Sequence, residues 1–209
     1  MTASVTSVNV GAVRRLTYQG TEVSSGIFKE PAQGRVTLRG VNLEGDDQAD
    51  RSVHGGPTKA VYAYAAEDYR WWETQLGRSL QPGQFGENLT TEGIDVNGSF
   101  VGERWRIGTA VLGITIPRLP CYKLGMKMGD PRFLKRFADA LRPGAYLSVI
   151  EEGAISAGDS IDVIWRPEHR LTIRDAARIF LFEHDRAREL LVPELPLSWR
   201  EWASERGRS

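Results

Sequence analysis

Cysteine and histidine are scarce in this chain, whose 209 residues include one cysteine, Cys121, and three histidines. A single cysteine excludes an internal disulfide, and it excludes an iron–sulfur cluster held by four thiolates of this chain. The sequence also contains no His-Glu-x-x-His motif, no cysteine pair and no P-loop, so zinc hydrolases and nucleotidases lack support. Any redox chemistry therefore needs a bound cofactor and electrons from elsewhere.

Net charge and long hydrophobic runs are lacking as well. The 27 basic and 27 acidic residues cancel, so no broad field attracts nucleic acid or an anionic membrane. No run approaches the ~18 consecutive apolar residues of a membrane span. The first residues, Met1 to Val5, do not resemble a secretory signal. We expect a cytoplasmic protein that binds neither nucleic acid nor membrane.

Short strand-like runs occupy the first three quarters of the chain and are separated by glycine-rich turns. Many short strands at this spacing predict a mostly β fold, either a barrel or a sandwich. The predicted strands cover residues 5–10, 35–38, 60–64, 105–107, 111–116, 146–150 and 160–164. Two helices interrupt them, at residues 67–76 before Gly77 and at 131–141 with Asp130 as the N-cap.

The composition changes after Arg166-Pro167, where glycine almost disappears. The pattern predicts three short helices, one beginning after Thr172, one at residues 185–191 and one with a capping box from Ser198 to Glu201. We therefore divide the chain into a main domain, 1–164, and a helical domain, 165–209. So small a helical core is marginal alone, and we expect it to dock on the main domain or on another subunit. A helix-turn-helix that binds DNA is the other interpretation. Residues 165–209 contain nine arginines and eight acidic residues, so their net charge of about +1 gives little support for binding to phosphates.

The surroundings of Cys121 suit a presented thiol. Pro117 and Pro120 exclude a continuous helix there, while Arg118 and Lys123 are cations that favour the thiolate. A thiolate ligates soft metals and attacks electrophiles. The alternative is a small buried side chain without reactivity, which is common for a lone cysteine.

Two further segments carry groups that could hold a ligand. His54 is followed by Gly55 and Gly56, which let backbone amides approach a ligand, and Lys59 offers a point charge to a phosphate. Residues 85–93 supply an amide, carboxylates and hydroxyls suited to the polar edge of a heterocycle. Each segment alone is also compatible with a solvated turn.

Together, five segments in order resemble the MOSC domain, the carboxy-terminal domain type of the molybdenum-cofactor sulfurases. They are Gly45-Asp46 to Tyr62, Pro82-Gly83 to Leu89, Val101-Gly102 to Gly108, Pro117 to Leu124, and Gly158-Asp159. Residues 26–31 and the helical tail further resemble the YiiM-like subfamily, in which a small three-helix domain follows. The resemblance implies a MOSC-type β-barrel with flanking helices.

The resemblance also implies a function. It implies a molybdenum cofactor, bound as molybdopterin, with Cys121 as the metal ligand. It implies reduction of N-hydroxylated compounds, such as 6-N-hydroxylaminopurine, to the amine and water. The expected cofactor contacts are His54, Gly55, Lys59, Glu87, Asn88, Thr90, Arg118 and Cys121. Lys29 is expected as a cation near the substrate. An external donor, a flavoprotein reductase by analogy, would supply electrons, and a homodimer is conceivable.

Proton delivery and two other functions stay open at this point. His54 could donate the proton to the departing oxygen, because histidine titrates near neutral pH. It could instead hydrogen-bond the pterin. Cys121 could be the nucleophile of a hydrolase, with His54 and either Asp46 or Asp50 as its partners. A molybdopterin carrier or sulfur-relay module would bind the cofactor without turnover.

Overall fold

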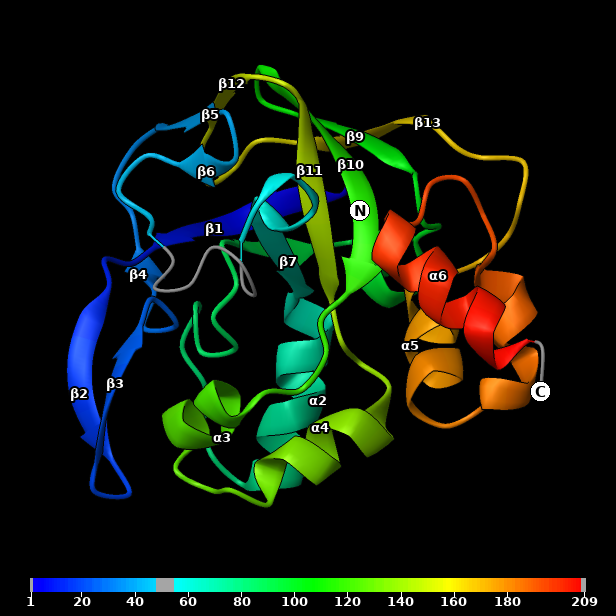
Figure 1. Ribbon diagram of the computed structural model, residues 1–209. Helices are drawn as coiled ribbons and strands as arrows, with labels where there is room; N and C mark the ends of the chain where they lie inside the picture. The colour runs from blue at the N-terminus through cyan, green and yellow to red at the C-terminus, as the bar shows by residue number, and fades with distance from the viewer. Residues whose placement is uncertain (1, 48–54, 208–209) are drawn as a thin grey trace.

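The structure is a computed structural model that describes residues 2–47 and 55–207 (Figure 1). Its elements, in chain order, are β1 (Ser4–Val10), β2 (Arg14–Tyr18), β3 (Thr21–Ser25), β4 (Glu30–Pro31), β5 (Val36–Arg39), β6 (Asn42–Leu43), the 3₁₀ turn η1 (Pro57–Lys59), β7 (Val61–Ala65), α2 (Ala66–Leu76), β8 (Leu89–Glu92), η2 (Val96–Gly98), β9 (Arg104–Ile107), β10 (Ala110–Pro117), α3 (Tyr122–Met128), α4 (Phe133–Ala140), β11 (Ala145–Glu151), β12 (Gly153–Ile155), β13 (Ile161–Trp165), α5 (Ile173–Leu181), η3 (His184–Leu190) and α6 (Leu197–Arg206). Each of the seven predicted strands is present, with ends within one residue of the prediction.

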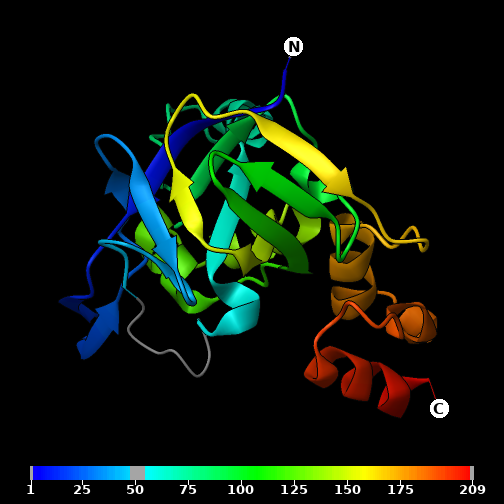
Figure 2. The same cartoon turned by 90° about the horizontal axis from the view of Figure 1, so that it is seen from above.

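One large sheet organises the molecule. Its eight strands follow the order β13-β9-β10-β11-β7-β8-β1-β4, and β7 and β8 form a parallel pair. The strands wrap around a common centre when seen from above (Figure 2). Backbone hydrogen bonds also join the first strand to the segment that enters the last one, from Val5 N to Asp159 O and from Ile161 N to Ala3 O, both 2.9 Å. The expected sheet-dominated fold with flanking helices is confirmed.

The hairpin of β2 and β3 was not predicted from the sequence. Its strands pair from Arg14 with Ser25 to Tyr18 with Thr21, and its two turn residues, Gln19 and Gly20, both have positive φ. Positive φ at both positions is typical of the tight turn that matches the twist of two antiparallel strands. Most of its side chains are exposed or half-buried, so it lacks the alternation of a half-buried strand.

Helices α2, α3 and α4 pack together below the sheet (Figure 1). They enclose an aromatic cluster that includes Tyr64, Trp72, Phe85, Phe133 and Phe137. The Trp72 Nε1 group donates to the Tyr64 hydroxyl at 2.7 Å, which satisfies both buried polar groups. Because every residue of β7 is buried, this strand lies between the aromatic cluster and the main hydrophobic core.

The helix ends partly match the predictions. Gly77 ends α2 in the left-handed conformation, as expected for a glycine after the last turn. In contrast, α4 begins at Phe133 and not at Pro131, because residues 131–132 form a turn. The Asp130 carboxylate still accepts from the Arg132 backbone N–H at 2.9 Å, just before the helix. Helix α3, directly after Cys121, was not predicted.

The C-terminal segment contains three helical pieces, of which the first begins where it was predicted. The Thr172 side chain accepts from the Asp175 backbone N–H and begins α5. The second piece, η3, is a 3₁₀ helix. The predicted capping box at Ser198 is wrong, because α6 begins one residue earlier and has no side-chain cap.

This helical segment docks on the large sheet beside β10 (Figure 1). The Ile173 N–H donates to Ser99 O, and the Val101 N–H donates to Leu171 O, each at 3.0 Å. Ile179, Leu190 and other apolar residues of the helices belong to the same hydrophobic cluster as the sheet. The helices thus share the core of the sheet, while a domain boundary after residue 164 stays a prediction.

Within residues 2–47 and 55–207, no helix combines the length and the apolar character needed to span a membrane.

Candidate functional site

One pocket brings together segments that are far apart in the sequence. The pocket is open to solvent, and its atom-free space of about 520 Å³ includes this open mouth, so only part of that space is enclosed by the protein. Its lining comes from the exit of the β2–β3 hairpin, the segment after β6, η1, β7, the loop before β8, β11, and the loop that leads through Cys121 into α3. The lining residues are Ser25, Gly26, Ile27, Lys29, Asp47, Lys59, Tyr62, Gly86, Asn88, Arg118, Cys121, Lys123 and Tyr146.

Cys121 lies at one side of this pocket and is half-buried. Strand β10 ends at Pro117, and Cys121 is the N-cap residue of α3, with extended backbone angles. The two prolines therefore keep a short non-helical loop between strand and helix, as predicted. The Arg118 Nη2 group lies 3.8 Å from the Cys121 sulfur. A guanidinium at this distance stabilises the thiolate over the thiol.

Arg118 is buried, although it carries a permanent charge. Its Nη1 group donates to the Phe85 carbonyl, and its guanidinium carbon lies 5.1 Å from the centre of the Tyr62 ring. Its Nε group has no hydrogen-bond partner in the part of the chain that the structure describes. A buried donor without a partner costs about 1–3 kcal/mol, so this atom would gain from a ligand that accepts.

Lys29 also forms part of the pocket wall, and two glycines hold its backbone. A Cβ atom at Gly11 would lie 2.6 Å from the Phe28 carbonyl oxygen, and one at Gly83 would lie 2.6 Å from the Lys29 carbonyl oxygen. Both distances are far below van der Waals contact, so only glycine allows the chain to pass this closely. The position of Lys29 is thus set by β1 on one side and by the loop before β8 on the other.

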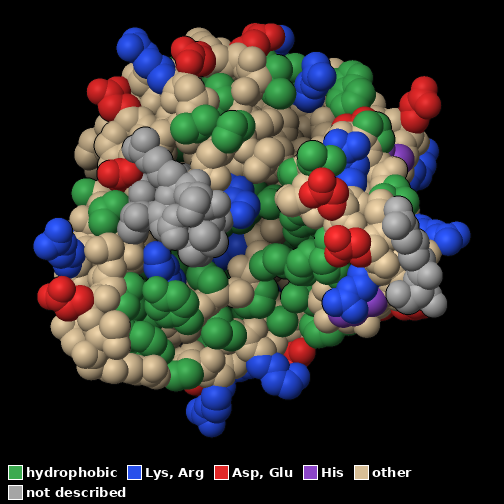
Figure 3. Space-filling view, viewed as in Figure 1, with side chains coloured by type: hydrophobic (Ala, Val, Ile, Leu, Met, Phe, Trp, Pro, Cys, Tyr) green, Lys and Arg blue, Asp and Glu red, His purple; other side chains and the backbone are tan. Residues whose placement is uncertain are grey.

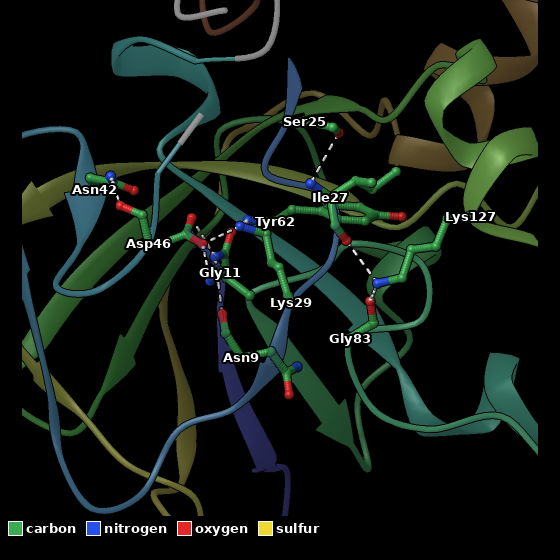
Figure 4. Close-up of polar contacts among 11 residues, drawn as sticks. Asn9, Gly11, Ser25, Ile27, Lys29, Asn42, Asp46, Tyr62, Gly83 and Lys127 are labelled. Carbon is green, nitrogen blue, oxygen red and sulfur yellow. Dashed lines mark hydrogen bonds and ion pairs between the residues drawn. The ribbon is translucent and has the colours of Figure 1, made fainter. Parts of the chain in front are cut away.

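The Lys29 ammonium forms a buried ion pair with Asp46, which follows β6 (Figure 4). The same carboxylate accepts from the Gly11 N–H and from Asn88 Nδ2, each at 2.9 Å. Burial lowers the pKa of Lys29, and the neighbouring Asp46 carboxylate opposes that shift. Asn88 continues the network because its Oδ1 accepts from the Tyr62 N–H at 3.1 Å.

Glu87 and Thr90 lie behind the pocket and not on its described lining. Glu87 is fully buried and accepts from the Tyr69 hydroxyl, from the Gly83 and Phe85 N–H groups, and from the Thr90 hydroxyl. Burial raises the pKa of Glu87, and these donors oppose the rise. Their hydrogen bonds hold the loop between residues 83 and 90, so the two side chains position the wall. Direct contact of these two residues with a cofactor stays a prediction.

Some of the remaining predicted site residues line the pocket and others do not. Lys59 ends η1 and lines the pocket, where burial lowers its pKa. Gly55 is half-buried before η1 and is not part of the described lining. His54 and Asp50 lie outside the described residues. Lys29, Asn88, Arg118 and Cys121 are brought together at the pocket, as the sequence analysis expected of site residues.

Lys127 of α3 holds two walls together, although no motif pointed to it. Its ammonium donates to the carbonyl oxygens of Ile27 and Gly83, the first at 2.7 Å (Figure 4). Burial lowers its pKa to about 8. Because α3 begins beside Cys121, this contact ties the cysteine loop to the Lys29 segment.

The family assignment follows from comparison with known proteins. The sequence matches the MOSC domain family over residues 50–162, which is more than half of the chain. The chain belongs to the MOSC domain family. Three relatives match most of the chain. YflK of Bacillus subtilis is 40% identical over 84% of this chain and 80% of its own. YiiM of Escherichia coli is 31% identical over 87% of this chain and 84% of its own.

The third relative, a Gibberella moniliformis protein named "Reductase", is 31% identical over 77% of this MOSC chain but only 29% of its own length. Among solved structures, YiiM from Geobacillus stearothermophilus superposes with a TM-score of 0.80 at 29% identity and covers 98% of both chains. The chain is therefore a YiiM-like MOSC protein, as the resemblance of its motifs suggested.

MOSC domains are associated in general with molybdenum-cofactor binding, so we tested whether the pocket suits such a group. Four lining residues are cationic, Lys29, Lys59, Arg118 and Lys123, and the acid among the described lining is Asp47. Lys and Arg side chains lie in the hollow at the centre of one face (Figure 3). Together with the Arg118 Nε atom that lacks a partner, this set suits an anionic ligand.

A thiolate-capable sulfur completes the donor set, because thiolate is a soft ligand for transition metals. In the described residues, no group of three or more His, Cys, Asp or Glu side chains could hold a bare metal ion. Cys121 thus offers a soft donor at this pocket, which suits a metal that arrives with ligands of its own.

Two lining residues, Tyr62 and Tyr146, were missed by the sequence analysis. Both lie in predicted strands, where an aromatic residue usually indicates core packing. Their ring centres are 5.2 Å apart, both residues line the pocket, and the Arg118 guanidinium lies over the Tyr62 ring.

Proposed function

We propose that this protein is a molybdenum-cofactor-dependent reductase of N-hydroxylated compounds, with Cys121 as the protein ligand to the metal. The observation that carries the proposal is the meeting of Cys121, Arg118 and three lysines in one pocket of a MOSC chain. The relative named "Reductase" supports reduction as the reaction class. The substrate class comes from the resemblance of the motifs to the YiiM-like subfamily.

In this proposal the side chains of the pocket have separate tasks. Cys121 supplies the sulfur, and Arg118 keeps it as the thiolate. Lys59 and Lys123 balance the negative charge of the cofactor. Bound in this way, the cofactor would supply two-electron oxygen-atom chemistry, while the protein orients it and shields the site from water.

The overall reaction needs both electrons and protons from outside the substrate. A compound R–NHOH takes up two electrons and two protons, its N–O bond breaks, and R–NH₂ and water leave. We propose a flavoprotein reductase as the electron donor, because one cysteine and the absence of cysteine pairs give this chain no redox centre of its own.

The first test is metal content. Wild type and Cys121→Ser would be purified from a host that makes molybdopterin, and molybdenum would be measured by elemental mass spectrometry. We expect near-stoichiometric molybdenum in the wild type and its loss in Cys121→Ser, which changes one atom and keeps the side-chain volume. Urea unfolding of both proteins, followed by tryptophan fluorescence, shows whether the variant is still folded.

The second test is turnover of the loaded wild type. Purified protein would receive electrons from reduced benzyl viologen and 6-N-hydroxylaminopurine as substrate, and the amine would be quantified by chromatography. Amine formation that depends on molybdenum supports the reductase. Bound molybdenum without turnover of any N-hydroxylated compound would favour a cofactor carrier instead, and wild type without metal in a host with confirmed cofactor supply would refute the molybdenum proposal.

A further inference from the structure

Release of water from an N–OH group requires a proton at the departing oxygen. We propose that Lys29 donates this proton and that Asp46 holds the Lys29 ammonium at the pocket wall. This role rests on the proposed reductase function. It assigns to Lys29 the task for which the sequence favoured a histidine.

The hydrogen bonding of Lys29 leaves donors for a ligand. An ammonium has three N–H donors, and Asp46 takes one of them. Among the described residues, the Lys29 ammonium has no second partner, although only 9% of the residue surface is exposed and it lines the pocket. A buried cation with unused donors is stabilised by an acceptor, and the hydroxyl oxygen of the substrate is such an acceptor.

Asp46 keeps this donor in place. Its side chain is fully buried, and its oxygens also accept from the Gly11 N–H and from Asn88 Nδ2. The Asn42 side chain in turn donates to the Asp46 carbonyl oxygen at 2.5 Å (Figure 4). The carboxylate is thus anchored by residues just after β1 and just before β8, and the backbone of Asp46 by β6, so the ion pair can fix the ammonium within the wall.

The charges around Lys29 act on its pKa in both directions. The groups that act on it are Asp46 and Glu87, which favour its charged form, and Arg118 with Lys127, which disfavour it. Burial is the largest influence and lowers the pKa of Lys29 from 10.5. A lysine with a lowered pKa releases its proton more readily than an exposed one.

The other polar groups of the pocket are less suited to this task. Arg118 does not give up a proton at ordinary pH. The Tyr62 hydroxyl already donates to the Pro143 carbonyl at 2.7 Å. Lys59 and Lys123 are half-buried, so water competes with a substrate for the N–H donors of their ammonium groups. Lys29 combines burial, a fixed position and unused donors.

The proposed step balances. The N–O bond breaks as two electrons arrive from the flavin-containing donor. The departing oxygen keeps its hydrogen, takes one proton from the Lys29 ammonium and leaves as water. The nitrogen takes the second proton from solvent and becomes the amine. Neutral Lys29 is then protonated again, with the Asp46 carboxylate beside it favouring the charged form.

The test uses two variants at the pair and one matched control. Lys29→Arg keeps the positive charge but cannot release a proton, and Asp46→Asn keeps the shape but removes the counter-charge. Lys135→Arg alters the exposed ion pair of Lys135 with Asp139, 2.6 Å apart, and serves as the control. Each protein would be assayed for molybdenum content and for the pH profile of 6-N-hydroxylaminopurine reduction with reduced benzyl viologen.

A second readout does not depend on turnover. In protein labelled with ¹³C-lysine, the Cε shift of Lys29 reports its titration in the apo form, with Lys29→Arg identifying the signal. Asp46 raises the pKa of Lys29, so Asp46→Asn should lower the titration midpoint. The alkaline limb of the rate profile should move to lower pH by the same amount.

We expect Lys29→Arg to keep its molybdenum and to lose about 100-fold in turnover, a typical contribution of a positioned general acid. The control should match wild type. Loaded Lys29→Arg with wild-type turnover and pH profile would overturn the role of Lys29 but not the reductase. An alkaline limb that stays in place while the Lys29 midpoint moves would also overturn it, and this result stands even if Lys29→Arg loses its cofactor. Loaded wild type without turnover would refute the proposed reductase itself, and with it this role.

Discussion

Replacing Gly83 by alanine tests whether the Lys29 wall is built on a close backbone approach. Gly83 has a φ of +84°, and an added Cβ would meet the Lys29 carbonyl oxygen at 2.6 Å. Gly77 after α2 also has positive φ, +64°, but an added Cβ there meets nothing within 4 Å. Comparing Gly83→Ala with Gly77→Ala therefore separates the free-energy cost of the backbone conformation from that of the close contact.

The two costs can be estimated from the geometry. A left-handed conformation costs an alanine about 1–2 kcal/mol, and we expect this loss of unfolding free energy for Gly77→Ala. Gly83→Ala carries the same cost and an overpacking cost of about 1–3 kcal/mol, because the obstacle is backbone and not the end of a flexible side chain. The expected loss for Gly83→Ala is therefore about 2–5 kcal/mol.

Urea unfolding measures both losses through the fluorescence of the six tryptophans. The ¹³C signal of Lys29 should shift in Gly83→Ala and stay unchanged in Gly77→Ala, because only the first substitution displaces its backbone. Equal losses in the two variants, within about 0.5 kcal/mol, together with an unmoved Lys29 signal, would refute the close approach.

Three further predictions concern the cation beside the thiol, the lysine of α3 and the helical segment. Arg118→Met should slow alkylation of Cys121 by iodoacetamide at pH 7 by about 10-fold, because the guanidinium stabilises the thiolate, and Arg132→Met, on the surface, should leave the rate unchanged. Lys127 has a pKa of about 8 when folded and 10.5 when unfolded, so between these values the unfolded state binds more protons and stability rises with pH. Lys127→Met should lose this rise, which is at most about 3 kcal/mol in urea unfolding measured from pH 7 to 10.5. Thr172→Ala should cost about 1 kcal/mol of unfolding free energy through loss of the α5 cap, and Thr172→Ser should cost almost nothing.

Six of the eight strands of the large sheet could be predicted, because they are short apolar or β-branched runs between turn residues. The two-residue strand β4 and the partly polar strand β8 were missed. Strand β10 shows this pattern most clearly, since it is apolar along nearly its whole length and buried throughout. The hairpin of β2 and β3 could not be predicted in this way. Its two arms are mostly polar, and its stability comes from backbone pairing and a tight turn.

Within the site, local chemistry predicted some positions and failed at others. The cations and prolines around Cys121 mark that loop in the sequence itself, so its place at a pocket could be expected. Glu87 and Asn88 are neighbours with similar polar character, yet one lies behind the wall and the other on it. Which way a polar side chain points depends on partners such as Tyr69 and Asp46, and those partners are distant in the sequence.

The Lys29–Asp46 pair is also a product of the topology. The two lie 17 positions apart in the sequence, and the hairpin exit and the segment after β6 bring them together beside the end of β1 and the start of β8. Removing one member of a buried ion pair leaves an uncompensated charge, whereas apolar replacement of both is often tolerated. Stability alone therefore gives little reason to keep such a pair beside a pocket. A reaction that consumes a proton gives a direct reason, because it needs an ammonium that is held in place, shielded from water and only partly satisfied by the protein.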